Sequence, residues 1–351
     1  MGTGALTVAT TRVDSRSLLG VSLLGGVVVL AASIAVVITI GPANLSVGDV
    51  YAVVFERLGF GAAEVSRIKD GIVWELRLPR TLLAAVCGAG LALCGAIMQS
   101  LLRNPLADPF VLGISSGAST GAVLVAVLGL GAGAVSLSAG AFAGAVISFA
   151  LVMLLAAGAG GGTSRVILAG VAGTQLFSAL TSFIVISSAD AEQTRGVLFW
   201  LLGSLSGADW ADVTVCGAIT LTGLLVCLTQ SAALDAFTFG NTAAASLGVS
   251  VRWVRVLLLG VTALVTAALV SAAGAIGFVG LVLPHAARFL VGPRNSRLLP
   301  TTVLVGAIFM VWVDALARTV FAPQEVPVGV VTALIGVPAF AVILFRMRST
   351  P

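Results

Sequence analysis

The sequence has few of the side chains on which most enzymes rely. Of its 351 residues only 9% are charged, and it contains one histidine, His285, and one lysine, Lys69. A soluble globular protein carries roughly 25% charged residues, so a soluble enzyme is excluded. A single histidine allows no set of paired catalytic groups and no cluster of metal ligands. We therefore interpret His285 as a hydrogen-bonded structural residue and expect no catalytic residue and no metal site.

A phosphate-binding loop of the form G-x-x-x-x-G-K-[ST] is also missing, because the only lysine lies in the run Arg67-Ile68-Lys69-Asp70. The chain is therefore expected to bind no cofactor of its own, and any ATP and magnesium would be held by another subunit. The basic residues are scattered, so the net charge of +4 does not indicate a nucleic-acid partner. The four cysteines have no C-x-x-C spacing and lie in apolar runs, which predicts small core residues.

Long hydrophobic runs dominate instead, and 59% of the residues are hydrophobic. A membrane span needs about 20 apolar residues, and helices satisfy their own backbone in lipid. The sequence thus predicts an all-α integral membrane protein, one transmembrane domain over 1–351, with about ten spans and no cleavable signal peptide. The predicted spans are 18–40, 80–102, 110–129, 138–158, 166–188, 211–230, 255–273, 277–291, 301–318 and 327–345.

The distribution of basic residues predicts the orientation. With the N-terminus inside, eleven basic residues lie on the cytoplasmic side and seven outside, which agrees with the positive-inside rule. Both termini are then cytoplasmic in a multi-pass protein of the plasma membrane. The tail 1–17 and the segment 231–252 lie inside, and the loop 41–79, which has room for a short surface helix, lies outside.

Three polar segments have both a structural and a functional interpretation. Arg77-Leu78-Pro79-Arg80 opens a span at the outer side, as an interfacial anchor or as a docking site for an acidic partner. The run 103–109, with two prolines, forms a tight inner loop or a constriction at the inner mouth. The segment 234–254 predicts a short helix over 240–247 capped by Gly248, either as an ordinary loop or as a rigid knob for a partner groove.

Together these segments resemble the FecCD family of ABC permeases, which includes cobalamin, haem and ferric-siderophore importers. The resemblance extends from about residue 50 to 346. The runs that carry it are RLPRTLLAAVCGAGLALCGAIMQSLLRNPLADPFVLGISSGAS (77–119), RVILAGVAGTQLFSALTS (165–182), FWLLGSLSGADW (199–210), GAIGFVGLVLPHAARFLVG (274–292), DALAR (314–318) and EVPVGVVTALIGVPAF (325–340).

The resemblance implies a type II ABC importer permease fold with ten helices. It implies a second permease subunit, either a copy or a paralogue, a pair of cytoplasmic ATP-binding subunits, and an external substrate-binding protein. The spans 166–188 and 327–345 would line the pathway. By position, the family assigns roles to twelve residues: docking of the binding protein to Arg77, Arg80 and Arg318; the cytoplasmic gate to Asn104, Leu106, Thr163 and Ser164; and coupling to the ATPase to Asn241, Thr242, Ala245, Leu247 and Gly248. Asn241 and Thr242 stand where the family often carries an acidic pair.

The function implied is therefore transport without covalent chemistry, with a ferric siderophore as first substrate and haem or cobalamin as alternatives. A secondary transporter driven by protons or sodium is the rival interpretation. It is disfavoured because Asp314 is nearly the only acid close to a span, and a helix would pair it with Arg318 four residues later.

Overall fold

The computed structural model describes residues 15–41, 43, 45–60, 65–129, 135–160, 162–188 and 190–348. Within these ranges all regular secondary structure is helical. Residues 1–14 of the predicted tail, and Pro42, Asn44 and 61–64 of the predicted external loop, lie outside the described residues. The all-α prediction is confirmed for the part that is described.

Seven helices of the described chain are long and apolar enough to cross a membrane. They are α1 (Ser15–Thr39), α4 (Leu78–Leu102), which continues from α3 (Arg67–Gly71) and the π-helical η1 (Ile72–Arg77), α6 (Leu137–Gly158), α7 (Thr163–Ser188), α9 (Trp210–Thr229), α12 (Val251–Ala273) and α14 (Asn295–Thr319). Three shorter apolar helices are α5 (Ile114–Leu128), α13 (Val279–Val291) and α15 (Val328–Arg348). Each predicted span is thus a helix, and the crossing of the three shorter ones stays a prediction.

The remaining helices lie between these. They are α2 (Val47–Arg57), the 3₁₀ turn η2 (Pro109–Leu112), α8 (Ala191–Leu201), α10 (Ser231–Phe237) and α11 (Asn241–Ser246). α2 is the short surface helix for which the loop 41–79 has room, and α11 confirms the predicted helix over 240–247. α8 was not predicted, although the sequence at its N-terminus forms a capping box. Oδ1 of Asp190 accepts a hydrogen bond from the backbone N–H of Gln193 at 2.8 Å, and the Gln193 side chain accepts one from the backbone N–H of Asp190.

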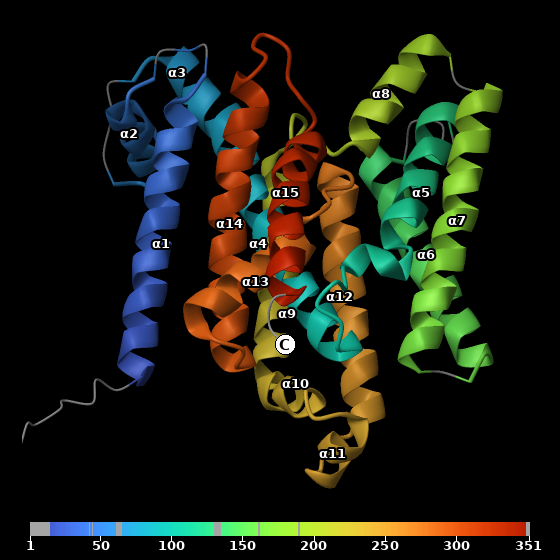
Figure 1. Ribbon diagram of the computed structural model, residues 1–351. Coiled ribbons are helices and arrows are strands. Elements are labelled where there is room, and N and C mark those ends of the chain that lie inside the picture. Colours follow the sequence, from blue (N-terminus) through green and yellow to red (C-terminus); the bar gives the residue numbers. More distant parts are fainter. Residues whose placement is uncertain are drawn as a thin grey trace, which may run out of the picture.

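α4 runs through the middle of the bundle and packs against α9, α12, α13 and α14 (Figure 1). Small residues allow the closest of these contacts. A Cβ added at Gly88 would lie 2.0 Å from the carbonyl oxygen of Gly306 on α14, so only glycine fits where the two backbones cross. The four cysteines are buried and free, as predicted for core residues.

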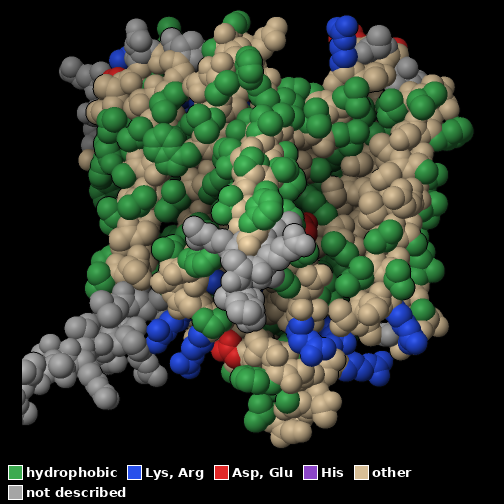
Figure 2. Space-filling view, in the orientation of Figure 1, with side chains coloured by type: hydrophobic (Ala, Val, Ile, Leu, Met, Phe, Trp, Pro, Cys, Tyr) green, Lys and Arg blue, Asp and Glu red, His purple; other side chains and the backbone are tan. Residues whose placement is uncertain are grey.

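The two ends of the bundle differ in shape and charge. At the upper end in Figure 1 lie α2, α3, α8 and the segment before α15, and at the lower end α10 and α11 protrude. On the face shown in Figure 2, basic side chains gather along the lower edge. They are arginines, because the single lysine, Lys69, lies in α3 at the upper end. α10, at this lower end, contains the acidic residue Asp235.

The side chain of Gln99 on α4 donates a hydrogen bond to a backbone carbonyl of α13 that has no partner within its own helix. Pro284 lies inside α13 and has no N–H for the carbonyl of Gly280, four residues earlier. Nε2 of Gln99 donates to this carbonyl and to that of Leu281, each at 3.2 Å. Arg288 Nη1 donates to Oε1 of the same amide at 2.6 Å, which fixes its orientation. The prediction of a short, irregular helix here was therefore correct, and Gln99 satisfies the carbonyl that Pro284 leaves without a partner.

Candidate functional site

An ion-paired cluster lies at the upper end between α4, α14 and the segment before α15. Arg80 Nε donates to Oδ1 of Asp314 at 2.9 Å, and its Nη1 donates to the two carboxylate oxygens of Glu325 at 2.9 and 3.0 Å. Arg318 Nε lies 3.1 Å from Oδ2 of Asp314, one helical turn away. Asp314 is fully buried, so the two guanidinium groups compensate a carboxylate that has lost its water.

In this cluster Asp314 pairs with Arg318, as predicted. The cluster also contains Glu325, which could not be predicted from sequence spacing. Glu325 stands 245 positions from Arg80 and follows the cis peptide bond between Ala322 and Pro323. It is the most exposed member of the cluster, with 37% of its side chain accessible, against 12% for Arg80. The partly open side of the cluster is therefore the contact between Arg80 and Glu325.

Arg77 occupies a different environment from the one expected of a docking residue. Its side chain is buried, and Nη1 donates to the carbonyl of Ile38 at 2.6 Å. Arg318 Nη1 similarly donates to the carbonyl of Ile40 at 3.4 Å. The last carbonyls of a helix lack partners within it and carry partial negative charge. Arg77 therefore fastens the end of α1 to α4, and Arg318 fastens it to the cluster. The side chains of Arg80 and Arg318 are similarly buried, at 12% and 10% exposure, and Glu325 is the accessible partner of Arg80.

The four residues expected at the gate fall in two turns at the lower end. α4 ends at Leu102 and is capped by Arg103, which has a left-handed backbone (φ 49°, ψ 39°). Asn104 then folds the turn, because its Oδ1 accepts from the backbone N–H of Leu106 at 2.9 Å. Leu106 is exposed. Thr163 and Ser164 form the first two positions of α7, after Gly162.

The protruding pair α10–α11 is a partly apolar knob, consisting of residues 231–249. Its residues Leu234, Phe237 and Ala244 are buried. Gly248, with φ +83°, ends α11 as predicted, because Val249 N–H bonds back to Ala244 at 3.0 Å. Phe239 and Leu247 are 78% and 69% exposed at its surface, together with Asn241, Thr242 and Ala245. A stable knob with exposed apolar side chains is typical of an interaction surface.

Three hydrogen bonds fasten the knob to the transmembrane bundle. Oδ1 of Asp235 accepts from the backbone N–H of Asn295 at 2.8 Å and from its Nδ2 at 2.7 Å. Asn295 is the first residue of α14 and is almost completely buried. Asp235 therefore satisfies orphan donors at the N-terminus of α14. Arg255 Nη2 also donates to Oδ1 of Asn241 at 3.1 Å. Sequence analysis missed the bond between Asp235 and Asn295, because 60 residues separate them.

Two acids outside the spans have shifted pKa values. A backbone hydrogen bond from Ser46 and the Lys69 ammonium lower the pKa of Asp49 from 3.8 to about 2. Burial raises the pKa of Asp108, which caps η2, to about 6, and the N–H of Phe110 only partly offsets this. Asp108 thus holds its proton to a higher pH than an exposed aspartate.

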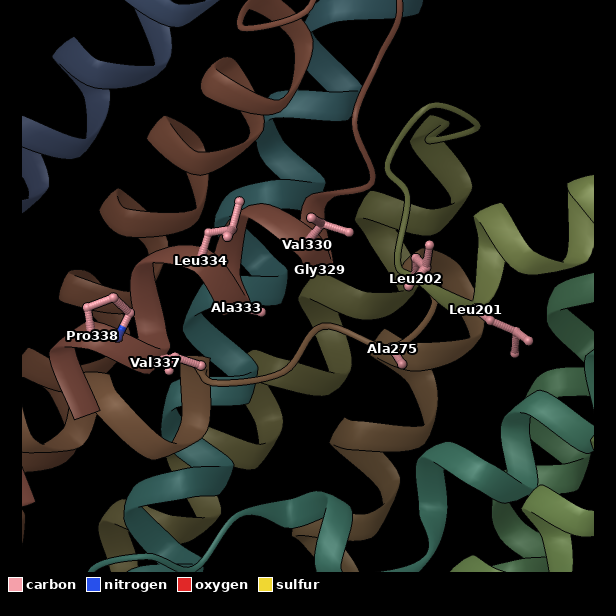
Figure 3. Close-up of a pocket in the computed structure, with 9 residues that line it drawn as sticks. All are labelled: Leu201, Leu202, Ala275, Gly329, Val330, Ala333, Leu334, Val337 and Pro338. Atoms are coloured by element: carbon pink, nitrogen blue, oxygen red, sulfur yellow. The ribbon is translucent and has the colours of Figure 1, made fainter. Parts of the chain in front are cut away.

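A cavity of about 540 Å³ opens on the face of α15. Figure 3 shows Val330, Ala333, Leu334 and Val337 of α15 on one side of it and Leu201 and Leu202, at the end of α8, on the other. Its lining contains no ionisable side chain. The cavity is lined on one side by α15, which is one of the two spans expected to line a pathway. On the other side it is lined by the end of α8, a helix that was not predicted. It offers space and weak contacts without groups for catalysis.

The chain was compared with known proteins. Residues 27–346 match the model of the FecCD transport family. The chain belongs to this family. It is 42% identical over 288 residues to the cobalamin import system permease protein BtuC of Halobacterium salinarum, which covers 82% of this chain and 76% of that protein. It is 36% identical to the Fe(3+)-citrate import system permease protein YfmD of Bacillus subtilis, over 87% of this chain and 91% of that one.

A solved structure gives the same result. An inward-facing conformation of a metal-chelate type ABC transporter superposes with a TM-score of 0.81 at 31% identity, over 92% of this chain and 98% of that chain. The chain is therefore a membrane permease of the FecCD family, a family of transport proteins. The apolar helices of the structure agree with this assignment.

Proposed function

We propose that the chain is the membrane-spanning permease subunit of an ATP-driven importer, through which a ferric siderophore passes. The observation that carries the proposal is the combination of three features in one chain. They are the ion-paired cluster at the upper end, the open apolar cavity on α15 and the apolar knob at the opposite end. A large polar chelate needs a wide pathway with weak wall contacts, since tight binding would hinder release. The relative that imports Fe(3+)-citrate supports an iron chelate.

In this proposal the upper end faces outward, both termini are cytoplasmic, and the protein lies in the plasma membrane. An external binding protein docks through acidic residues near Arg80, with Arg77 and Arg318 holding the surface in place. A second permease subunit completes the pathway beside α15 and α7. The knob, with Asn241, Thr242, Ala245, Leu247 and Gly248, fits a pair of ATP-binding subunits that hold ATP and magnesium. Their closure moves the knob and the gate turns of Asn104, Leu106, Thr163 and Ser164.

Cobalamin is a second candidate substrate, favoured by the 42% identity to a cobalamin permease. Haem belongs to the same set of large metal-bound ligands. The cavity lining does not separate them, because its apolar side chains provide space rather than a pattern of hydrogen bonds.

The deciding experiment measures uptake of radiolabelled ferric siderophore, cobalamin and haem in cells that lack the gene and in cells complemented with it. Loss of siderophore uptake alone, restored by complementation, supports the proposal. Loss of cobalamin or haem uptake alone keeps the importer and replaces the substrate. Unchanged uptake of all three contradicts the proposal.

A matched pair of variants tests the role of the knob. Leu247→Asp places a charge on its exposed apolar surface, and uptake and co-purification of the ATP-binding subunits should both fall at least tenfold. Leu24→Ala, on a lipid-facing position of α1 that is 68% exposed, should change neither. Full uptake by the Leu247→Asp variant would show that the knob does not couple to the ATPase.

A further inference from the structure

Helix α2 has one apolar face that packs against the protein. Val50 and Val53 are buried, and they belong to an apolar cluster that also contains Ile38 of α1 and Val73 of η1. Figure 1 shows α2 beside the upper part of α1, at the edge of the molecule. This packing fixes α2 at the level of the last turns of α1.

A second apolar face of α2 is uncovered. Its residues recur at the three- and four-residue spacing that places side chains on one side of a helix, and they are Val47, Tyr51, Phe55 and Leu58, the last of which caps α2. All four are exposed, from 41% at Val47 to 59% at Leu58. The ring of Phe55 lies 6.4 Å from that of Tyr51 and 6.3 Å from that of Phe60. These five residues form a continuous stripe, called the outer stripe below.

The charged residues of α2 point away from the outer stripe. Oδ2 of Asp49 lies 3.0 Å from Nζ of Lys69 on α3, and Arg57 pairs with Asp70 of the same helix. Glu56 is exposed, but at 100° per residue it lies about 145° around the helix from the middle of the stripe. The polar side of α2 therefore faces α3 and solvent, and the outer stripe forms a separate apolar surface.

The outer stripe continues the lipid-facing surface of α1. Every exposed side chain of α1 from Leu24 to Val36 is apolar, and in a membrane permease such a face contacts lipid. Val36 lies only two residues before Ile38, on which α2 packs. The apolar run of α1 ends at Ile40. α2 therefore lies where the hydrocarbon core gives way to the head groups.

We infer that α2 is an interfacial helix whose outer stripe inserts into the lipid bilayer at the upper end of the bundle. Tyrosine is enriched at membrane–water interfaces, where the ring contacts apolar groups and the hydroxyl contacts polar ones. A helix of this kind lies with its apolar face about 5–10 Å into the boundary between head groups and acyl chains. Because η1 packs on α2, the inserted helix also sets the level of Arg77 and Arg80 relative to the membrane surface.

The test compares two neighbouring positions on opposite sides of α2. The four native cysteines are buried, so a nitroxide label can be attached selectively to Phe55→Cys or Glu56→Cys in the full chain. Each labelled protein is placed in phosphatidylcholine nanodiscs, and power-saturation electron paramagnetic resonance measures contact with oxygen, which concentrates in lipid, and with a nickel chelate, which stays in water. We expect oxygen to dominate at position 55 and the nickel chelate at position 56.

Two results at position 55 would overturn the inference. Access to the nickel chelate equal to that at position 56 would place the stripe in water. Shielding from both reagents, or spin–spin broadening between labels on two chains, would place a protein on the stripe, such as a second copy of this chain.

A further variant tests whether the stripe itself anchors the helix. A label on Tyr51→Cys should gain severalfold in contact with the nickel chelate when Phe55→Ser is added, because the stripe then loses its central ring. Adding Glu56→Gln instead should leave that contact unchanged. Size-exclusion chromatography confirms that each protein is folded. An unchanged contact in the Phe55→Ser background would show that packing against α1 alone sets the level of α2, and would overturn the anchoring role.

Discussion

Arg80 already has an acidic partner within its own chain. If a binding protein docks here as proposed, its acidic residue would compete with Glu325, whose side chain is the more accessible of the two. Such docking would require that the ion pair between Arg80 and Glu325 opens or is shared. The residues behind it stay fixed, since Asp314 is buried and joined to both arginines.

Neutralising Glu325 should therefore strengthen docking. The Glu325→Gln variant removes the competing charge, and a partly exposed ion pair contributes up to about 1 kcal/mol. We expect the affinity for the cognate binding protein, measured by calorimetry with the purified permease, to rise up to about fivefold. Glu192→Gln, at the same end on α8, is the control. A weaker affinity of the Glu325→Gln variant would mean that Glu325 itself contacts the binding protein.

Asp108 should make the stability of the fold depend on pH. Because its pKa rises from 3.8 to about 6 on burial, the folded chain binds a proton more tightly than the unfolded chain. The resulting stability is fully present below pH 3.8 and is lost as pH rises through 6. The wild-type melting temperature should thus fall from pH 5 to pH 7 more steeply than that of the Asp108→Asn variant, which retains a capping side chain. Parallel curves would exclude Asp108 as the titrating group.

The sequence alone predicted some of the ion-pair and hydrogen-bond partners of the charged residues. The spacing of Asp314 and Arg318 gave their pairing, because helical geometry is local. The partners Glu325 and Asn295 could not be predicted, since hydrogen bonds across 245 and 60 residues depend on tertiary packing. For the same reason the burial of Arg77 against the end of α1 was not foreseen.

At the scale of helices, hydrophobic length predicted the spans well and their beginnings less well. α12 begins at Val251 and α14 at Asn295, four and six residues before the predicted starts. Polar residues extend both helices beyond the apolar runs, and Asp235 satisfies the N-terminus of α14. Hydrophobicity cannot report such caps. α8 was missed because its length of 11 residues lies below that of a span.

The bond between Asp235 and Asn295 should hold the knob to α14. In the Asp235→Ala variant two donors of the buried Asn295 lose their acceptor, at a cost of about 1–3 kcal/mol. We expect amide exchange in the first turn of α14 to accelerate roughly tenfold or more, and uptake to fall. Asp235→Asn keeps an acceptor oxygen and should restore most of both. Unchanged exchange in the alanine variant would show that the knob is held by its apolar contacts alone.

At the scale of the molecule, the cavity on α15 should be accessible to water during transport. Ala333 lines it, and the four native cysteines are buried, so Ala333→Cys introduces a selectively reactive thiol. A charged methanethiosulfonate reagent should modify it in membranes, and saturating substrate should slow this at least severalfold. Leu24→Cys, on the lipid face of α1, should not react. Absence of reaction at position 333 would place the pathway elsewhere.

The identity of the cargo is the property that the sequence predicted least. Family membership could be predicted because many sequence runs typical of the family follow one another in the family's order. These runs form helices of the bundle. The wall of the cavity consists of leucine, valine, alanine, glycine and proline, and these side chains discriminate by size more than by hydrogen bonding. Selection among ferric siderophore, haem and cobalamin is therefore expected to lie with the binding protein that delivers the ligand.

The knob also has a consequence for the supply of this protein. Phe239 and Leu247 project from a polar end of the bundle, so a chain made in excess of its partners presents them to the surrounding water. Quality-control proteases and chaperones act on such features, and small differences in exposure change abundance severalfold. If the proposed partner subunits cover the knob, we expect the steady-state amount of this chain to follow their synthesis.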